Sequence, residues 1–501
     1  MRLRIVLDPI VTIGYRIPNI TNGKRDADNF IDKQKGNEDN MEKKILIKNA
    51  RAIVTCDASD QVFQDMDMLI EGSQIVQIGK SIATQDAEVI DGRDKFVYPG
   101  LINTHHHFFQ TFVRNLMTID YPNLLVVEWL DKIYRIFQKV DSEVIYYSSL
   151  TAMGDLLKHG CTCAFDHQYC YTRASGKLLV DRQMEAAAQL GIRYHAGRGT
   201  NTLPRSKGST IPENMLETTD EFIADCERLI DLYHDSDPFS MKQIVVAPCQ
   251  PINSYIETFK ESVALARAKG VRLHTHLGEG ENVIMQERWN KRTLEWCQDI
   301  GFIGPDVWIA HGWELHPEEF KFMGQTGTGV SHCPSPAVLG GFPILDMKAL
   351  QKDKVIISLG CDGSATNDSS SLLDSLRMAY LMQAYHSKER GGCLSPYELL
   401  KIATVNGAKT LGRDKLGSLE VGKAADLFMI NTGVLELTGT LHDPKNILAR
   451  VGVTGPVWLT MVNGKVVFRD GQLLGVDEGA VAEEGEKVCT RVLRNECEAF
   501  R

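Results

Sequence analysis

The 501-residue sequence predicts a parallel α/β barrel that carries a small sheet domain built from both ends of the chain. Helical stretches alternate with short β-branched runs between residues 99 and 415, which is typical of a parallel sheet. An alternation that lasts for roughly 300 residues suits an eight-stranded barrel. Strand-like segments flank this region at both ends. We therefore expect five parts: an N-terminal extension at 1–43, sheet segments at 44–98 and 416–475, the barrel at 99–415, and a tail at 476–501.

Composition indicates a globular protein, with 43% hydrophobic and 24% charged residues. A net charge of −10 argues against a nucleic acid partner, which needs a basic surface. No run of about 18 apolar residues suggests a membrane span. The twelve cysteines form no CxxC pair, and free cysteines spread over a long chain indicate a reducing compartment. We expect a cytoplasmic protein without a membrane or nucleic acid partner.

The N-terminal segment differs from the rest of the chain. Residues 20–44 are charged and poor in apolar side chains, which predicts disorder. Met41 lies where an ordered pattern begins, so we interpret it as the natural start of the protein.

The small sheet domain is predicted from short apolar runs broken by turn residues. Segments 44–55, 67–79 and 87–100 have this pattern and are typical of antiparallel strands. Segments 425–430 and 457–474 are similar. Asn463 and Gly464 form a two-residue hairpin signal, because both tolerate positive φ.

Within the predicted barrel, each strand is followed by a polar cluster. We expect helices at 142–159, 181–190, 256–269 and 369–388, and Gly160 and Gly270 are typical helix ends. Strands are expected at 192–197, 243–248, 271–277, 307–312 and 355–363. Catalytic residues of barrels gather at the C-terminal ends of the strands. Histidines and carboxylates from several strands can therefore converge.

The spacing of histidines in this region predicts a metal site. Residues i and i+2 of an extended segment share a face, so His105 and His107 point together while His106 turns away. The same spacing occurs at His274 and His276. Three neutral imidazoles with a carboxylate from Asp362 would suit Zn²⁺ or Fe²⁺, which activates water at neutral pH.

The motifs that carry these residues also resemble a known family. They are "PGLINTHHHFFQT", "LHTHLGEGE", "WIAHG" and "CDGSATNDSS", and the likeness runs from about residue 44 to 475. The chain resembles the amidohydrolase superfamily, in the branch of aminohydrolases that act on nitrogen heterocycles. It is most similar to 8-oxoguanine deaminases and hydroxyatrazine-type aminohydrolases. This resemblance implies a distorted (β/α)₈ TIM barrel with a small β-sandwich formed by both terminal regions.

The resemblance also implies the ligands of one divalent metal, Zn²⁺ or alternatively Fe²⁺: His105, His107, His276 and Asp362. His274 is then a structural neighbour. Two-metal relatives need a bridging lysine or glutamate on the fourth strand, and "GIRYHAGRGT" at 191–200 offers neither. We therefore predict a single metal ion.

Other roles follow from the same resemblance. Glu279 shuttles a proton to the ring nitrogen, and His311 hydrogen-bonds the attacking water. Asp362 accepts the proton of that water and passes it to the leaving ammonia. Gln110 and Arg198 lie where relatives contact the substrate. Arg198 could equally form a surface ion pair.

These assignments predict a metal-dependent hydrolytic deaminase of 8-oxoguanine or a related oxopurine or pterin, a small-molecule heterocycle. A triazine amino- or chlorohydrolase of the hydroxyatrazine type is the alternative, and a non-catalytic assembly protein is a remote one. Relatives are often dimers or larger, so a homo-oligomer is allowed. Pro336 and Ala337 replace a common Ser and Asn near the substrate. Trp313 could stack on the heterocycle or pack against the barrel.

Overall fold

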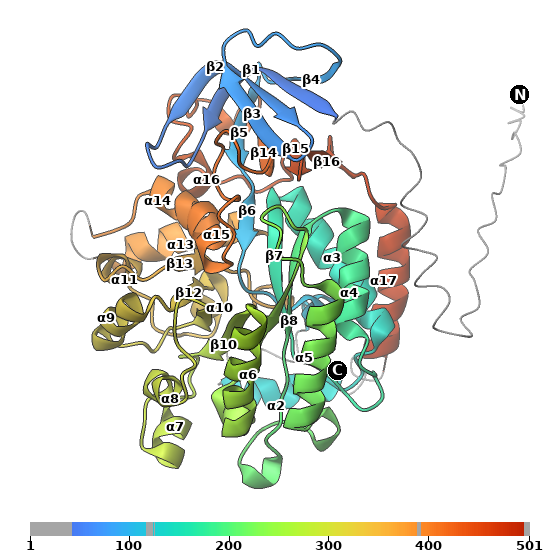
Figure 1. Cartoon of the computed structure of the whole chain (residues 1–501), viewed down its shortest axis with the longest axis vertical. Coiled ribbons are helices and arrows are strands. Elements are labelled where there is room, and N and C mark those ends of the chain that lie inside the picture. Colours follow the sequence, from blue (N-terminus) through green and yellow to red (C-terminus); the bar gives the residue numbers. More distant parts are fainter. Residues whose placement is uncertain (1–42, 117–123, 125, 388–391, 495–501) are drawn as a thin grey trace, which may run out of the picture. The chain divides into compact units, whose positions relative to one another are not determined.

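The computed structural model describes residues 43–116, 124, 126–387 and 392–494. Residues 1–42, including the expected natural start at Met41, lie outside the described residues. The described chain contains two sheets, one of eight strands and one of nine (Figure 1).

The eight-stranded sheet is a nearly closed parallel barrel. Its strands follow the chain in order, and every hydrogen-bonded pair is parallel. Thr104, just after the first strand, donates its backbone N–H to the carbonyl of Leu359 in the last strand at 3.0 Å, which brings the two edges together. The predicted barrel is confirmed. Its strands are β6 (Leu101–Asn103), β7 (Cys161–Gln168), β8 (Arg193–Arg198), β9 (Lys242–Val246), β10 (Arg272–Leu277), β11 (Val307–His311), β12 (Gly329–His332) and β13 (Ile357–Leu359).

Helices connect and cover the barrel strands. The four helices expected from sequence are present as α3, α4, α6 and α13. The last begins later than expected, because the Ser371 side chain accepts the backbone N–H of Asp374 and caps the helix at that point. The helices are α2 (Val126–Phe137), α3 (Ser142–Lys158), α4 (Leu179–Leu190), α5 (Thr219–Tyr233), α6 (Ile256–Lys269), α7 (Asn282–Trp289), α8 (Thr293–Asp299), α9 (Pro317–Thr326), α10 (Pro334–Leu339), α11 (Met347–Lys352), α12 (Ser364–Asn367), α13 (Leu372–His386), α14 (Pro396–Lys401), α15 (Gly407–Thr410), α16 (Ile447–Arg450) and α17 (Glu478–Leu493).

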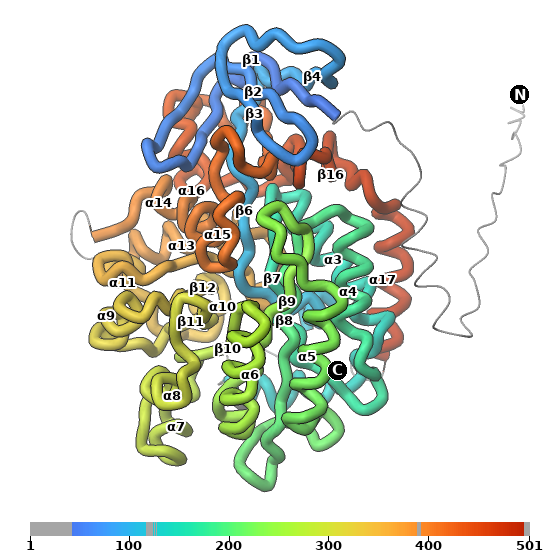
Figure 2. Tube along the Cα trace, in the orientation of Figure 1, coloured from blue at the N-terminus to red at the C-terminus, as the bar shows by residue number. Residues whose placement is uncertain are grey.

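The nine-stranded sheet joins the two ends of the described chain. Strand β14 pairs with β5, so the C-terminal strands continue the N-terminal ones (Figure 2). Asn463 and Gly464, with φ of 52° and 73°, turn the predicted hairpin. Strands β4 and β5 run parallel to β1 rather than antiparallel as expected, because residues 80–86 return the chain to the start of β1. The strands are β1 (Lys44–Val54), β2 (Val62–Glu71), β3 (Gln74–Gly79), β4 (Ala87–Asp91), β5 (Lys95–Pro99), β14 (Leu427–Asn431), β15 (Leu459–Val462), β16 (Lys465–Arg469) and β17 (Gln472–Leu473).

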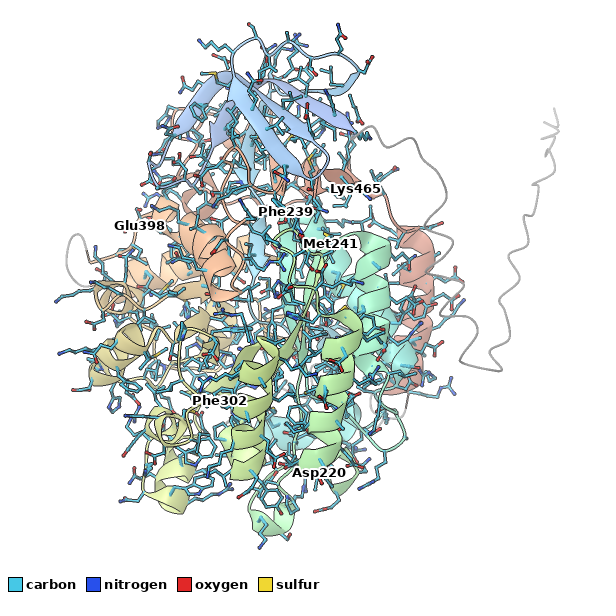
Figure 3. The ribbon with its side chains drawn as sticks, viewed as in Figure 1. Asp220, Phe239, Met241, Phe302, Glu398 and Lys465 are labelled. Carbon is cyan, nitrogen blue, oxygen red and sulfur yellow. The ribbon has the colours of Figure 1, made fainter. Side chains whose placement is uncertain are left out.

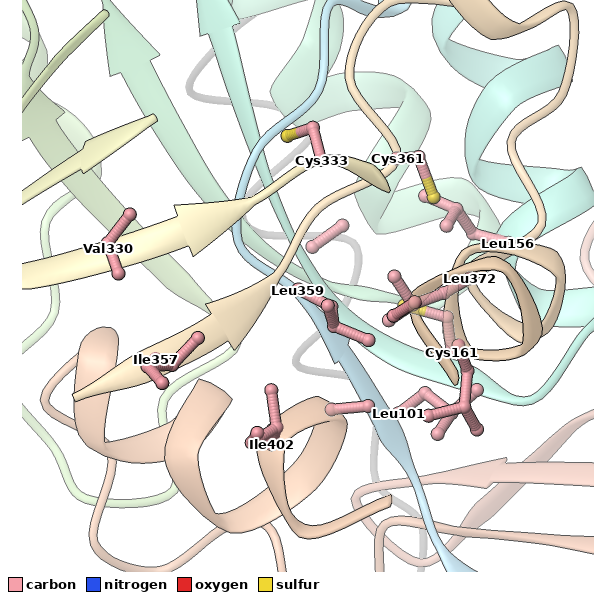
Figure 4. Packing of buried hydrophobic residues seen from close by; sticks show 14 of the residues in the cluster. Leu101, Leu156, Cys161, Val330, Cys333, Ile357, Leu359, Cys361, Leu372 and Ile402 are labelled. Atoms are coloured by element: carbon pink, nitrogen blue, oxygen red, sulfur yellow. The ribbon is translucent and has the colours of Figure 1, made fainter. Parts of the chain in front are cut away.

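The largest apolar core lies around the barrel strands. Leu101 of β6, Cys161 of β7 and Leu359 of β13 are buried in one cluster where the barrel edges meet (Figure 4). On the outer side, Phe302, labelled in Figure 3, packs on Phe259 of α6 with ring centroids 5.1 Å apart. Burial of such side chains gives the strand ends a rigid support.

The segment expected to be a C-terminal tail contains helix α17. Val488 and Val492 on this helix are buried beside the 3₁₀ helix η2 (Phe108–Val113), and the Cys489 thiol donates to the carbonyl of Phe112 at 3.4 Å. The helix therefore packs against the segment that follows His107. Among the described residues, none of the helices combines the length and apolar character that crossing a membrane requires.

Candidate active site

The predicted site residues meet at the C-terminal end of the barrel. His105 and His107 follow β6, His276 lies near the end of β10, His311 ends β11, and Asp362 follows β13. His311 and Asp362 have φ of 75° and 62°, in the left-handed region that such side chains rarely adopt. Backbone strain of this kind is common where a protein must aim a functional group.

The hydrogen bonds of two histidines fix which ring nitrogen carries the proton. His107 Nδ1 lies 2.9 Å from the carbonyl of His167, and His276 Nδ1 lies 2.8 Å from the carbonyl of Cys249. A carbonyl only accepts, so each Nδ1 is the donor and each Nε2 keeps a free lone pair. These two lone pairs face one another, because the Nε2 atoms are 3.0 Å apart.

His105 is oriented through a second histidine. His274 Nδ1 donates to the carbonyl of Trp308 at 3.0 Å, so His274 Nε2 must accept from His105 Nδ1, 2.9 Å away. His105 Nε2 is therefore unprotonated, and it is buried without a hydrogen-bond partner. His274 is a positioning neighbour, as the resemblance implied. His106 turns away, with its Nε2 3.1 Å from the Ser370 hydroxyl.

Asp362 completes a set of donors that suits a cation. Its Oδ1 lies 3.3 Å from both His105 Nε2 and His107 Nε2. Its Oδ2 accepts from the Thr366 hydroxyl at 3.2 Å. Separations of this size are expected between neighbouring ligands that share one ion at about 2.1 Å. Lone pairs this close repel one another unless a positive charge lies between them, so the donor set fits a divalent metal.

Burial favours the neutral form of His105 and His276, as metal ligands require. It lowers the pKa of His105 to about 4 and that of His276 well below the usual range, and neighbouring imidazoles add to the effect in both cases. The same cause lowers the pKa of His311. Neutral imidazoles present lone pairs to a metal at any pH near neutrality.

Glu279 and His311 lie beside this cluster. Glu279 Oε1 is 3.6 Å from His311 Nε2, and the His311 ring stacks on His276 with centroids 5.4 Å apart. Burial, followed by the nearby carboxylates of Asp362 and Glu281, raises the pKa of Glu279 well above its usual range. Burial therefore favours the protonated form of the Glu279 carboxyl, of which only 15% of the side chain is exposed.

A pocket opens directly onto these groups. Gln110 is part of its wall, and the Gln110 Oε1 accepts the backbone N–H of Ala365 at 3.3 Å. Gln110 therefore lines the pocket, and its contact with a substrate stays a prediction. The other lining residues are His107, Val126, Trp129, Leu130, Tyr134, Tyr169, Cys249, Gln250, His276, Glu279, Asp362 and Thr366.

An outer chamber shares walls with this pocket. Leu130, Gln250 and Glu279 line both, and the outer walls are largely apolar, with Ile252 and Phe342 among them. Trp313 does not line either cavity; its ring packs on Phe342 at 4.5 Å between centroids. The packing alternative for Trp313 is therefore the one that the structure favours.

Arg198 lies at the end of β8 but does not reach the pocket. Its Nε donates to Asp225 at 2.8 Å, and Nη1 and Nη2 donate to Glu217 at 2.9 and 2.6 Å. The side chain is fully buried and stacks over the Tyr171 ring, 3.6 Å from its centroid. The ion pair is thus internal rather than on the surface, and Arg198 is not among the residues that line the pocket or the outer chamber.

Several residues that support the site were not predicted from the sequence. Asp166 accepts the backbone N–H of Phe108 at 2.5 Å, and the carbonyl of His167 orients His107. Glu281 binds the turn that carries Glu279. The polar run Asp166-His167-Gln168 ends the apolar strand β7. Catalytic residues of barrels gather at the C-terminal ends of the strands, and this rule predicted the position of the histidines. The same rule could therefore have predicted the role of this polar run.

A parallel barrel with such a cluster at its C-terminal strand ends is the arrangement of a (β/α)₈ hydrolase. Residues 96–467 match the amidohydrolase family, and the chain belongs to that family.

Comparison with individual proteins gives the same result. The chain is 48% identical over 452 residues to a hydroxydechloroatrazine ethylaminohydrolase of Pseudomonas sp. (strain ADP), covering 88% of this chain and 94% of that protein. It is 33% identical over 441 residues to an 8-oxoguanine deaminase of Pseudomonas aeruginosa, covering 87% and 96%. A zinc-containing atrazine chlorohydrolase from Arthrobacter aurescens TC1 superposes with a TM-score of 0.85 at 28% identity, covering 89% of this chain and 100% of that one.

Proposed function

We propose that this protein is a metal-dependent hydrolytic deaminase of an aminated nitrogen heterocycle, 8-oxoguanine or a related oxopurine or pterin, and that it releases ammonia. The observation that carries the proposal is the convergence of three unprotonated Nε2 atoms and a carboxylate beside the carboxyl group of Glu279 in the pocket. His105, His107, His276 and Asp362 would hold one divalent ion, zinc as in the chlorohydrolase neighbour. Such an ion lowers the pKa of a coordinated water towards about 7, which provides a nucleophile at neutral pH.

The side chains of the site supply the proton transfers. Glu279 carries the proton that a ring nitrogen needs when water adds to the adjacent carbon. Asp362 accepts one proton of the attacking water and transfers it to the departing amine. Glu279, having given its proton to the ring nitrogen, takes the remaining hydroxyl proton as the ring carbonyl forms. The neutral His311, whose Nε2 faces Glu279 at 3.6 Å, hydrogen-bonds the oxygen as charge develops. Gln110 binds the ring from the pocket wall.

A single ion is consistent with the fourth barrel strand, β9: its one lysine, Lys242, is exposed at the N-terminal start of the strand, and residues 247–250 after the strand contain no lysine or glutamate that could bridge a second ion. The segment that was expected to be the fourth strand forms β8, which is the third strand of the barrel. Strand β8 contains no lysine or glutamate either. Its arginines serve structural ion pairs: Arg193 Nε donates to Asp426 at 2.6 Å, and Arg198 binds Asp225 and Glu217.

Release of an alkylamine from a hydroxytriazine is the second candidate. Two observations favour it: the relative with 48% identity is an ethylaminohydrolase, and the outer chamber has apolar walls that suit an alkyl group. The proton transfers would be the same, since only the leaving amine differs.

The test is product analysis on zinc-loaded protein. Zinc is quantified by mass spectrometry, and then ammonia and alkylamine release are measured with 8-oxoguanine, guanine, isoxanthopterin, cytosine and hydroxyatrazine. We expect about one zinc per chain and ammonia from an oxopurine or pterin, with kcat lowered by about 10²- to 10⁴-fold but still measurable in Glu279→Gln. Ethylamine as the main product would favour the second candidate. Absence of any amine product with zinc bound would refute both.

A further inference from the structure

Glu281 is a buried carboxylate that no catalytic step described above uses. Only 1% of the residue is exposed, and within the described residues it forms no ion pair. Its Oε1 accepts the backbone N–H of Gly278 at 2.5 Å, and its Oε2 accepts the backbone N–H of Glu279 at 2.6 Å. A carboxylate buried without a cation is costly, so these two hydrogen bonds must stabilise it.

The two bonded N–H groups flank the Cα of Gly278, one of two glycines in this turn. Gly278 has φ of 74°, and lacking a Cβ it could rotate more freely than other residues. The Glu281 carboxylate binds the amide N–H on each side of the Gly278 Cα. It therefore restrains both φ and ψ of Gly278. The direction of the next residue, Glu279, depends on those two angles.

The opposite side of the turn is held by the loop that follows His311. Gly312 donates its N–H to the carbonyl of Leu277 at 2.9 Å, and Glu314 donates to the carbonyl of Gly278 at 3.1 Å. A Cβ on Gly278 would lie 3.1 Å from the Cα of Gly312. The turn is therefore clamped between the Glu281 carboxylate and the loop that carries His311.

Capping of helix α7 does not explain Glu281. The residue precedes Asn282, the first residue of the helix, yet its side chain makes no hydrogen bond to the helix N-terminus. Both oxygens point back along the chain, towards the catalytic turn.

We propose that Glu281 is a positioning residue that holds Glu279 in its catalytic orientation. The clamp keeps the Glu279 carboxyl in the pocket, where Oε1 is 3.6 Å from His311 Nε2 and Oε2 accepts from Gln250 Nε2 at 3.3 Å. This inference rests on the proposed role of Glu279 as proton carrier. A displacement of about 1 Å in a reacting group can cost on the order of 100-fold in rate.

The test is a double-mutant cycle in the zinc-loaded full chain. Glu281→Gln is made in the wild type and in Glu279→Gln, with Glu287→Gln, on the exposed part of α7, as the matched control. We expect Glu281→Gln to lower kcat by about 10- to 100-fold in the wild type, with KM changed less than about threefold and zinc retained. In the Glu279→Gln background the further loss should be less than about threefold, because Glu281 acts through Glu279.

Equal losses in both backgrounds, or no loss in the wild type, would overturn the inference. If Glu279→Gln itself retained full activity, the proposed function of Glu279 would fail instead, so the two failures are distinguishable. If Glu281→Gln does not fold, Glu281→Asp provides the same comparison together with amide hydrogen exchange. Faster exchange confined to residues 277–281 is expected, and unchanged exchange with unchanged kcat would contradict the clamp.

Discussion

Replacement of Arg198 by methionine should destabilise the protein without changing how it binds substrate. The substitution leaves two carboxylates without their buried guanidinium partner. Asp225 keeps its hydrogen bond from Arg228 at 2.8 Å, and Glu217 keeps its hydrogen bond from the Thr200 hydroxyl at 2.8 Å. Each carboxylate therefore retains one hydrogen-bond partner. Breaking a buried ion pair usually costs about 3–5 kcal/mol, and the remaining partners place this case near about 3–4 kcal/mol.

The size of the melting shift follows from the length of the folded unit. An unfolding entropy of about 2.1 cal/mol/K per residue, summed over Lys43–Arg501, gives on the order of 1 kcal/mol/K. The expected loss is therefore about 3–4 °C, measured by calorimetry at a fixed scan rate with zinc present. Arg205→Met, which breaks an exposed pair with Asp131, is the control and should shift the melting temperature by less than about 1 °C. A tenfold rise in KM with an unchanged melting temperature would instead make Arg198 a substrate contact.

Two further predictions concern the metal and pH. His276→Ala should reduce the bound zinc at least tenfold while the circular dichroism spectrum is unchanged. As the control, replacement of the exposed His386 by alanine should leave the zinc content unchanged. A full zinc content in His276→Ala would refute the ligand assignment. Burial raises the pKa of Asp166 from 3.8 to about 7, so its contribution to stability is complete below about pH 4 and is lost as pH rises through about 7. Asp166→Asn should therefore gain stability relative to the wild type between pH 4 and 8 in denaturant titrations, and parallel curves would contradict this.

Local sequence patterns were sufficient wherever neighbouring residues decide the structure. The i, i+2 spacing places His105 and His107 on one face because alternation is a property of any extended segment. Asn463 and Gly464 turn a hairpin because their own φ preferences demand it. The alternation of helices and strands predicted the barrel, and polar residues after each strand predicted where the site lies.

Long-range contacts decided the rest. Sequence could not show that Arg198 is buried, because its partner Asp225 lies 27 residues away on another element. It could not show that α17 packs beside η2, since the bond from Cys489 to Phe112 joins residues 377 positions apart.

The sequence by itself determined the type of fold, the strand ends that carry the chemistry and the kinds of side chain that gather there. Only the tertiary structure decided how each side chain is used. His274 and His276 both donate Nδ1 to a backbone carbonyl. His274 Nε2 accepts from His105 Nδ1, which makes His274 a support, whereas His276 Nε2 faces His107 Nε2 and keeps its lone pair for a metal. Glu281 is two residues from Glu279, but its role depends on the left-handed turn at Gly278. The physical reason is that residue spacing fixes which side chains share a face of one segment, whereas hydrogen-bond partners and burial come from segments that meet only when the barrel closes.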